Sequence, residues 1–136
     1  MFLVDTNVIS EVRKGARANA GVREFWQTVD DTSVYLAVQT IGELRRGVER
    51  IRLRGDVPQA LILENWLQEV VGEYCHRILT FDADCAQIWG KLTSTSSQNP
   101  IDKQIAAIAL LHDLTVVTRN TADFAVTRVP LRNPFT

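Results

Sequence analysis

The strongest constraint on the fold of this chain is its alternation of short apolar runs with longer segments of helical periodicity. The apolar runs span residues 2–4, 34–38, 77–81 and 114–118, and their β-branched and aromatic content is typical of strands. The run at 114–118 has the continuous apolar character of a parallel strand that is buried on both faces. Strands that alternate with helices predict an α/β layer architecture.

The helical segments between these runs carry recognisable start and stop signals. Thr6 or Asn7 is expected to cap a short helix that closes near Gly15, and a second helix covers residues 22–29. A longer helix starts near Thr40 and ends at Gly55. Further helices are predicted over residues 57–71, capped by Asp56, from Asp82 or Asp84 to residue 92, and from Pro100 to residue 110, after a Ser/Thr loop at 93–99.

Apolar residues occupy more than one face of the helix predicted at 57–71. A helix that packs only against its own domain needs one apolar stripe. The surplus predicts that part of this helix contacts a second copy of the chain or another partner.

Length and cysteine content favour one intracellular domain. The 136 residues suit a single domain over 1–136, with a core that needs no disulfide framework. Cys75 and Cys85 have neither disulfide-scaffold nor CxxC metal spacing, which favours a reducing, cytoplasmic setting. The first residues lack a signal-peptide pattern, and no apolar run reaches the ~20 residues of a membrane span.

Four carboxylates fall where the predicted architecture places functional groups. Asp5 ends the first strand, Glu43 lies early in the helix after the second, Asp102 opens a helix, and Asp123 follows the last strand. Ligands of open parallel sheets bind outside the carboxyl ends of the strands. Converging carboxylates repel one another, and Mg²⁺ or Mn²⁺ is the usual compensating charge. This pattern points to metal-assisted hydrolysis of a phosphate ester.

Each acid also has an ordinary structural interpretation. Asp5 and Asp102 are good helix-capping residues, Glu43 is spaced to pair with Arg46 or Arg50, and Asp123 suits a turn. The position of the acids alone therefore leaves a functional and a structural interpretation open.

At these residues the sequence resembles the PIN domains of VapC-type toxin ribonucleases of toxin–antitoxin pairs. The resemblance lies in four segments, spread in order over residues 1 to about 130: Phe2-Leu3-Val4-Asp5-Thr6-Asn7-Val8, Gly42-Glu43-Leu44-Arg45-Arg46-Gly47, Pro100-Ile101-Asp102 with Ile105-Ala106-Ala107, and Thr118-Arg119-Asn120-Thr121-Ala122-Asp123-Phe124. The last segment is the most specific. Where the family tends to have glycine, this chain has Asp113 between a helix and the last predicted strand.

The resemblance implies an α/β protein with a PIN fold, which is a central, mostly parallel β-sheet flanked by helices. It also implies Mg²⁺- or Mn²⁺-dependent endoribonuclease activity. It implies that Asp5, Glu43, Asp102 and Asp123 hold the metal and position the attacking water. It further implies an RNA substrate, a small cognate antitoxin whose tail occupies the site, and a homodimer. It makes Asn7, Thr118 and Asn120 candidates for orienting the acids or the substrate. Apart from the resemblance, Arg119 is a candidate for contacting a substrate phosphate, because it is a basic residue next to Asn120.

Two other functions compete with the ribonuclease. An aspartyl-nucleophile phosphatase places its nucleophile after the first strand but commonly has a second acid two residues later, where this chain has Asn7. A non-catalytic α/β interaction module would use the acids only as helix caps. The chain has no Gly-rich nucleotide-binding loop.

Charge excludes a general polycation but not a nucleic-acid enzyme. The 15 Lys and Arg against 16 Asp and Glu give a net charge of −1. Five arginines between positions 45 and 54 are expected to form mainly a solvated helix face. Without the four proposed site acids, 12 acids remain, and the rest of the chain carries +3.

Overall fold

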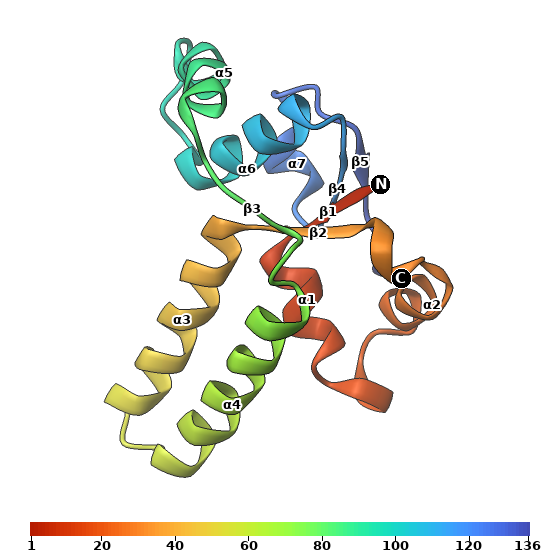
Figure 1. The fold of residues 1–136 in the computed structure, drawn as a ribbon, viewed down its shortest axis with the longest axis vertical. Helices are drawn as coiled ribbons and strands as arrows, with labels where there is room; N and C mark the ends of the chain where they lie inside the picture. Colours follow the sequence, from red (N-terminus) through yellow and green to blue (C-terminus); the bar gives the residue numbers. More distant parts are fainter.

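A five-stranded parallel sheet forms the centre of the protein, in a computed structural model that describes residues 1–136. The strand order is β3-β2-β1-β4-β5, so the first strand is central and its neighbours come from distant parts of the chain (Figure 1). The strands are β1 (Phe2–Val4), β2 (Val34–Ala37), β3 (Ile78–Leu79), β4 (Thr115–Val117) and β5 (Leu131–Arg132). Every pairing is parallel, as predicted.

Seven α-helices connect and cover these strands. They are α1 (Thr6–Val12), α2 (Ala20–Thr28), α3 (Val38–Leu53), α4 (Val57–Glu73), α5 (Ala83–Thr93), α6 (Pro100–Leu111) and α7 (Thr121–Ala125). Short 3-10 helices occupy Gly15–Arg17 and Asp31–Ser33. Helices α3 and α4 form a long antiparallel arm that projects from the sheet, while α5, α6 and α7 lie on the opposite side (Figure 1).

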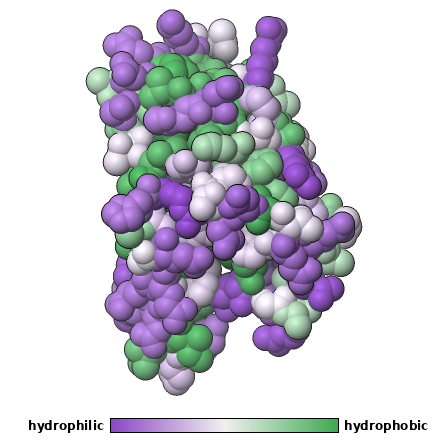
Figure 2. All heavy atoms as spheres, turned by 45° about the vertical axis from the view of Figure 1, so that its right-hand side comes forward, coloured by the Kyte–Doolittle hydropathy of each residue, from purple (hydrophilic) through white to green (hydrophobic).

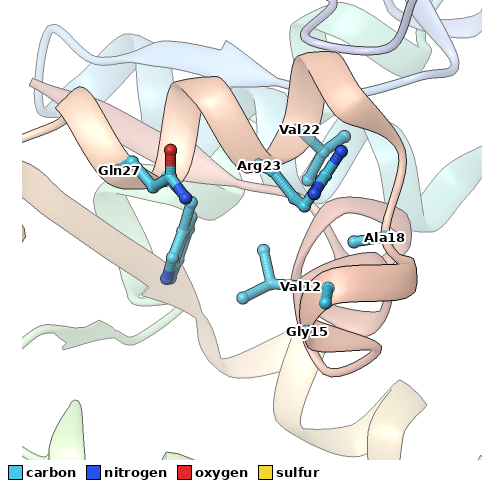
Figure 3. Close-up of a pocket in the computed structure, with 8 residues that line it drawn as sticks. Val12, Gly15, Ala18, Val22, Arg23 and Gln27 are labelled. Atoms are coloured by element: carbon cyan, nitrogen blue, oxygen red, sulfur yellow. The ribbon is translucent and has the colours of Figure 1, made fainter.

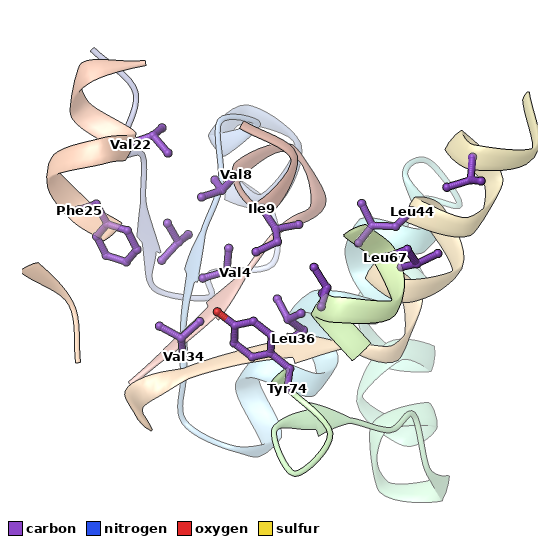
Figure 4. Packing of buried hydrophobic residues seen from close by; sticks show 13 residues of the cluster. Val4, Val8, Ile9, Val22, Phe25, Val34, Leu36, Leu44, Leu67 and Tyr74 are labelled. Atoms are coloured by element: carbon purple, nitrogen blue, oxygen red, sulfur yellow. The ribbon is translucent and has the colours of Figure 1, made fainter. Parts of the chain in front are cut away.

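The sheet separates two apolar cores. One core lies between the sheet and α1–α4, and its larger members include Val4, Phe25, Leu36 and Leu67 (Figure 4). The other lies under α5–α7 and contains Leu3, Ile105 and Phe124. Neighbouring residues of β1 thus supply opposite cores, as expected for a strand that is buried on both faces.

Two predicted helix starts are wrong by one or two residues, for a local reason. Asp5, not Thr6 or Asn7, caps α1, because its carboxylate accepts a hydrogen bond from the Thr6 backbone N–H at 2.8 Å. The third helix begins at Val38 instead of Thr40, directly after β2 and without a side-chain cap. Asp82, one of the two predicted caps of α5, accepts from the Cys85 N–H at 3.0 Å.

Two further local predictions are confirmed, and two short strands differ from the prediction. Asp56 caps α4, and Asp113 adopts the left-handed conformation that its position requires, with φ of 56°. Strand β3 is shorter than the apolar run at 77–81, and β5 was not predicted because two residues show no periodicity. Cys75 and Cys85 are unpaired. No helix has the length and apolar character needed to cross a membrane.

The apolar surplus predicted for residues 57–71 is visible on α4. Leu61 and Ile62 are each more than half exposed, as is Val57 at the start of the helix. Leu53, at the end of α3, is also exposed. Figure 2 shows hydrophobic atoms at the lower end of the molecule, where α3 meets α4.

Candidate functional site

Asp5 is a buried carboxylate at the carboxyl end of the central strand. Its backbone N–H donates to the Val117 carbonyl at 2.9 Å, which continues the β1–β4 pairing past the last strand residue. The Asp5 residue is only 4% exposed. Burial raises the pKa of this carboxyl above its usual value, the charge of Glu43 adds to the rise, and hydrogen bonds from Thr118, Thr6 and Asn7 oppose it.

A hydrogen-bond network fixes Asp5 to the loop after β4. The buried Thr118 hydroxyl donates to Asp5 Oδ2 at 2.8 Å and accepts from the Asn120 N–H at 3.0 Å. The Asn7 amide donates to Asp5 Oδ2 at 3.2 Å, and its Oδ1 accepts from the Arg119 N–H at 3.0 Å. Asn7 and Thr118 therefore contact the first acid directly, and the backbones of Arg119 and Asn120 are bonded to these two residues.

Glu43 reaches the same region from α3 through hydroxyl groups. Thr6 Oγ1 donates to Glu43 Oε1 at 2.7 Å and lies 3.3 Å from the hydroxyl oxygen of the fully buried Thr40. Thr6 is thus bonded to Asp5 through its backbone and to Glu43 through its side chain. From the sequence, Thr6 was expected only as a helix cap. Its position between Asp5 and Asn7 is the signal in the sequence that could have indicated its contact with Glu43.

Asp102 lies in the first turn of α6 and is electrostatically coupled to the other three acids. Its pKa is raised to about 6, mainly by burial and then by the charges of Asp5, Asp123 and Glu43. The partial positive charge at the helix N-terminus favours the ionised form but does not offset these effects. The charges of the other three predicted acids therefore act on Asp102.

Asp123 is the most accessible of the four. It lies in the first turn of α7, the short helix that follows β4, and is exposed to solvent. The site thus grades from the buried Asp5 through the partly buried Glu43 and Asp102 to Asp123 at its rim.

The four acids are near one another without closing around one point. The structure contains no group of three or more His, Cys, Asp or Glu side chains that is arranged to hold a metal ion. The donor chemistry nevertheless suits a hard divalent cation, because every candidate ligand is a carboxylate oxygen. Mg²⁺ commonly binds through one or two carboxylates and retains several waters, so a site of this kind needs no protein cage.

Hydrogen bonds from Lys103 and Trp89 hold the segment that precedes Asp102, which includes the loop of residues 94–99. The Lys103 side chain is buried, and its ammonium group donates to the Ser96 carbonyl at 2.7 Å. Trp89 of α5 also reaches the start of α6, where its indole N–H donates to the Pro100 carbonyl at 3.2 Å. These contacts fix the segment that leads into the helix of Asp102.

The arginines of α3 mostly pair with acids of the α3–α4 arm. Arg45 makes two hydrogen bonds of 2.6 Å to Glu64 of α4, and Arg52 also pairs with Glu64. This confirms the expected solvated face for these two arginines. Arg46 lies closer to the candidate site, 3.7 Å from Glu43.

Two surface hollows differ in their relation to the acids. One of about 340 Å³ lies between α1, the 3-10 helix Gly15–Arg17 and α2, and none of the four acids lines it (Figure 3). The other, of about 270 Å³, lies between α1, α3 and α4 and is lined at one end by Thr6 and Glu43. Arg13 and Trp66 also line this second hollow. It therefore continues outward from the acidic region.

The acids lie outside the carboxyl ends of the strands, where open α/β sheets bind their ligands, so the fold is that of an α/β protein with a candidate site at this edge. The profile of the PIN domain matches residues 2–129, so the chain belongs to the PIN-domain family. It is 35% identical to Toxin FitB of Neisseria gonorrhoeae and 31% identical to VapC ribonuclease Y4jK of Sinorhizobium fredii. The alignments cover 99% of this chain and 99% and 98%, respectively, of those proteins.

A solved structure shows the same fold over the whole chain. The crystal structure of FitAcB from Neisseria gonorrhoeae superimposes with a TM-score of 0.87 at 33% sequence identity. The match covers 98% of this chain and 98% of that chain. The predicted PIN-like architecture is thereby confirmed.

Proposed function

We propose that this protein is a Mg²⁺- or Mn²⁺-dependent endoribonuclease and the toxin component of a type II toxin–antitoxin pair. The observation that carries the proposal is the placement of the acids at the carboxyl edge of the sheet: Thr6 links Asp5 to Glu43, and Asp102 and Asp123 lie in the first turns of α6 and α7. The names of its full-length relatives, a toxin and a VapC ribonuclease, support the same activity.

Asp5, Glu43, Asp102 and Asp123 are the residues that hold the metal in this proposal. A bound divalent cation supplies a more acidic water and stabilises the leaving oxygen of a phosphodiester. Burial and then the charges of the other three acids raise the pKa of Asp102, and metal binding would offset those charges.

The surrounding residues position the acids and the substrate. Thr118 and Asn7 orient Asp5 and oppose the rise of its pKa that burial causes, since both donate to its Oδ2 atom. Thr6 orients Glu43 through its hydroxyl. Arg119 and Asn120 lie exposed at the rim, where their side chains contact the RNA.

The proposal includes two protein partners. A small antitoxin covers the site, in keeping with the toxin name of one relative. A second copy of the chain forms a homodimer, which accounts for the exposed Leu61 and Ile62 on α4.

The phosphatase alternative fits the geometry of Asp5 less well. A nucleophilic carboxylate needs an accessible oxygen, whereas Asp5 is buried, and both of its oxygens accept hydrogen bonds. The interaction module would use the acids only as helix caps. It gives no reason for acids from four separate parts of the chain to lie close enough for their charges to affect one another.

Cleavage of a structured RNA by the purified, partner-free protein tests the proposed function. We expect cleavage that requires Mg²⁺ or Mn²⁺, disappears with EDTA, and is lost in Asp5→Asn. Asp84→Asn, an exposed acid in the first turn of α5, is the matched control and retains activity. Equal activity of Asp5→Asn and wild type would reject the site, and folded wild type that cleaves no RNA would favour the interaction module.

A further inference from the structure

The last four residues of the chain are fastened to the start of α2. The Asn19 amide donates to the Thr136 carbonyl at 3.0 Å, and Asn19 Oδ1 accepts from the Thr136 N–H at 3.1 Å. The Gly21 N–H donates to Thr136 Oγ1 at 3.2 Å. A Cβ atom at Gly21 would lie 2.1 Å from the Pro134 carbonyl oxygen, so glycine is required for this close approach.

This attachment places Phe135 between the apolar core and the rim of the acidic site. The Phe135 side chain is partly buried and packs against the core formed with α1–α4. On its other side, the guanidinium carbon of Arg119 lies 4.9 Å from the centre of the Phe135 ring. A ring that is held by core packing therefore supports a cation beside the site.

Arg119 has the features of an anion-binding residue. Its backbone N–H donates to Asn7, and the residue stands between Thr118 and Asn120 in the network around Asp5. It is exposed, and it forms no ion pair within 4.0 Å of any carboxylate. Stacking on a ring leaves the N–H edges of a guanidinium free for bidentate bonds to a phosphate.

We propose that Phe135 is a positioning residue, which holds the Arg119 side chain at the rim of the acidic site in readiness for a phosphate group of the RNA backbone. The proposal rests on the ribonuclease function above. Its physical basis is preorganisation: an arginine that is already ordered by the ring loses less conformational freedom when it binds. The C-terminal segment thereby contributes to substrate binding without contacting the substrate.

A structural role for Phe135 makes a different prediction from a positioning role. If the ring only fills space, a leucine of similar hydrophobicity replaces it with a small loss of stability and no specific effect on RNA. If the ring positions Arg119, the loss of its π face weakens the contact with phosphate. The double variant with Arg119→Gln separates the two, because a ring that acts only through Arg119 has no further effect on RNA binding once that side chain is replaced.

The experiment compares Phe135→Leu, Phe135→Trp, Arg119→Gln and the Phe135→Leu/Arg119→Gln double variant. Binding of a fluorescein-labelled structured RNA is followed by anisotropy in EDTA over a range of salt concentrations. KM and kcat for cleavage of that RNA are measured in Mn²⁺. Thermal unfolding of each variant shows whether it is folded at the assay temperature.

We expect Phe135→Leu to weaken RNA binding and raise KM by about two- to fivefold, with little change in kcat. Phe135→Trp retains near-wild-type values, and Arg119→Gln lowers the salt slope by about 1. In the double variant, Phe135→Leu adds nothing to the effect of Arg119→Gln.

The proposal is overturned if Phe135→Leu and Phe135→Trp bind RNA equally well, if the two substitutions act additively, or if Arg119→Gln leaves the salt slope unchanged. A different result, in the cleavage assay, would reject the ribonuclease proposal. In that case wild type and Asp5→Asn have the same cleavage, while the anisotropy measurements still decide whether Phe135 and Arg119 act together in binding RNA.

Discussion

Asp5 shows that the structural and the functional interpretation of one residue need not exclude each other. It caps α1 through one carboxylate oxygen and, through the other, accepts bonds from Thr118 and Asn7. The cap fixes the orientation of the carboxylate at the end of β1. The interaction that starts the helix therefore also prepares the acid for the proposed metal.

Thr118 is the residue on which the order around Asp5 depends most. Thr118→Val removes the 2.8 Å hydrogen bond to Asp5 and leaves the Asn120 N–H without its acceptor. We expect about a 10- to 100-fold loss of cleavage activity and a loss of stability of about 1–2 kcal/mol. Thr118→Ser keeps the hydroxyl and most of the activity. Cleavage rates and urea unfolding measure both effects, and equal rates for Val and Ser variants would contradict this role.

The raised pKa of Asp102 makes the stability of the metal-free protein depend on pH. In the folded protein this carboxyl holds its proton up to about pH 6, whereas in the unfolded chain it loses the proton near the ordinary aspartate pKa of 3.8. The folded state therefore binds more protons in this window, and its stability falls as the pH rises through it.

Asp102→Asn removes this cost and is expected to stabilise the metal-free protein. The gain is on the order of 1–3 kcal/mol near pH 8 and vanishes near pH 4. Urea unfolding in EDTA across this range measures it, and Asp84→Asn serves as the control. A gain that does not change with pH, or a destabilisation at the higher pH, would contradict the coupling among the acids.

At the scale of elements, the sequence is most informative where the periodicity is long. Helices α3, α4 and α6 and the central strands were predictable from their apolar residues. These residues recur at helical spacing in the helices and form continuous runs in the strands that are buried on both faces. Strand β5 was not predictable, since Leu131 and Arg132 pair with β4 only through the tertiary fold. The same holds for the link from Thr6 to Glu43, which joins residues 37 positions apart.

The close approach of the C-terminal segment to α2 predicts opposite effects for two glycine substitutions. Gly21→Ala forces Pro134 and Thr136 away from the helix, and we expect a loss of about 1–3 kcal/mol. Gly72→Ala in α4 meets no atom within 4 Å and is expected to stabilise by about 0.5–1 kcal/mol. Chemical unfolding compares them, and a Gly21→Ala protein as stable as wild type would contradict the packing of the segment.

At the scale of the whole molecule, near-neutral charge conceals an uneven distribution. The net charge of −1 combines a body of +3 with four acids concentrated at one edge of the sheet. A metal ion that offsets those acids leaves a surface that attracts RNA phosphates. Near-neutrality is therefore compatible with a nucleic-acid enzyme.

The exposed apolar face of α4 predicts self-association. We expect wild type to be a homodimer in light scattering after size-exclusion chromatography, and Leu61→Gln/Ile62→Gln to shift it toward monomer. Asp84→Asn, at an exposed position of α5 on the other side of the sheet, leaves the dimer intact. A wild-type monomer at all concentrations, or a double variant as dimeric as wild type, would contradict the assignment of this face.

The proposed function requires four carboxylates from separate parts of the chain to act as one metal site, and Mn²⁺ binding followed by electron paramagnetic resonance tests this most directly. We predict saturable Mn²⁺ binding to wild type and to Asp84→Asn. Binding is expected to be weaker by at least about tenfold in Asp5→Asn, Glu43→Gln, Asp102→Asn and Asp123→Asn. Unchanged affinity in these four variants, or no Mn²⁺ binding to the folded wild type, would contradict the proposed site.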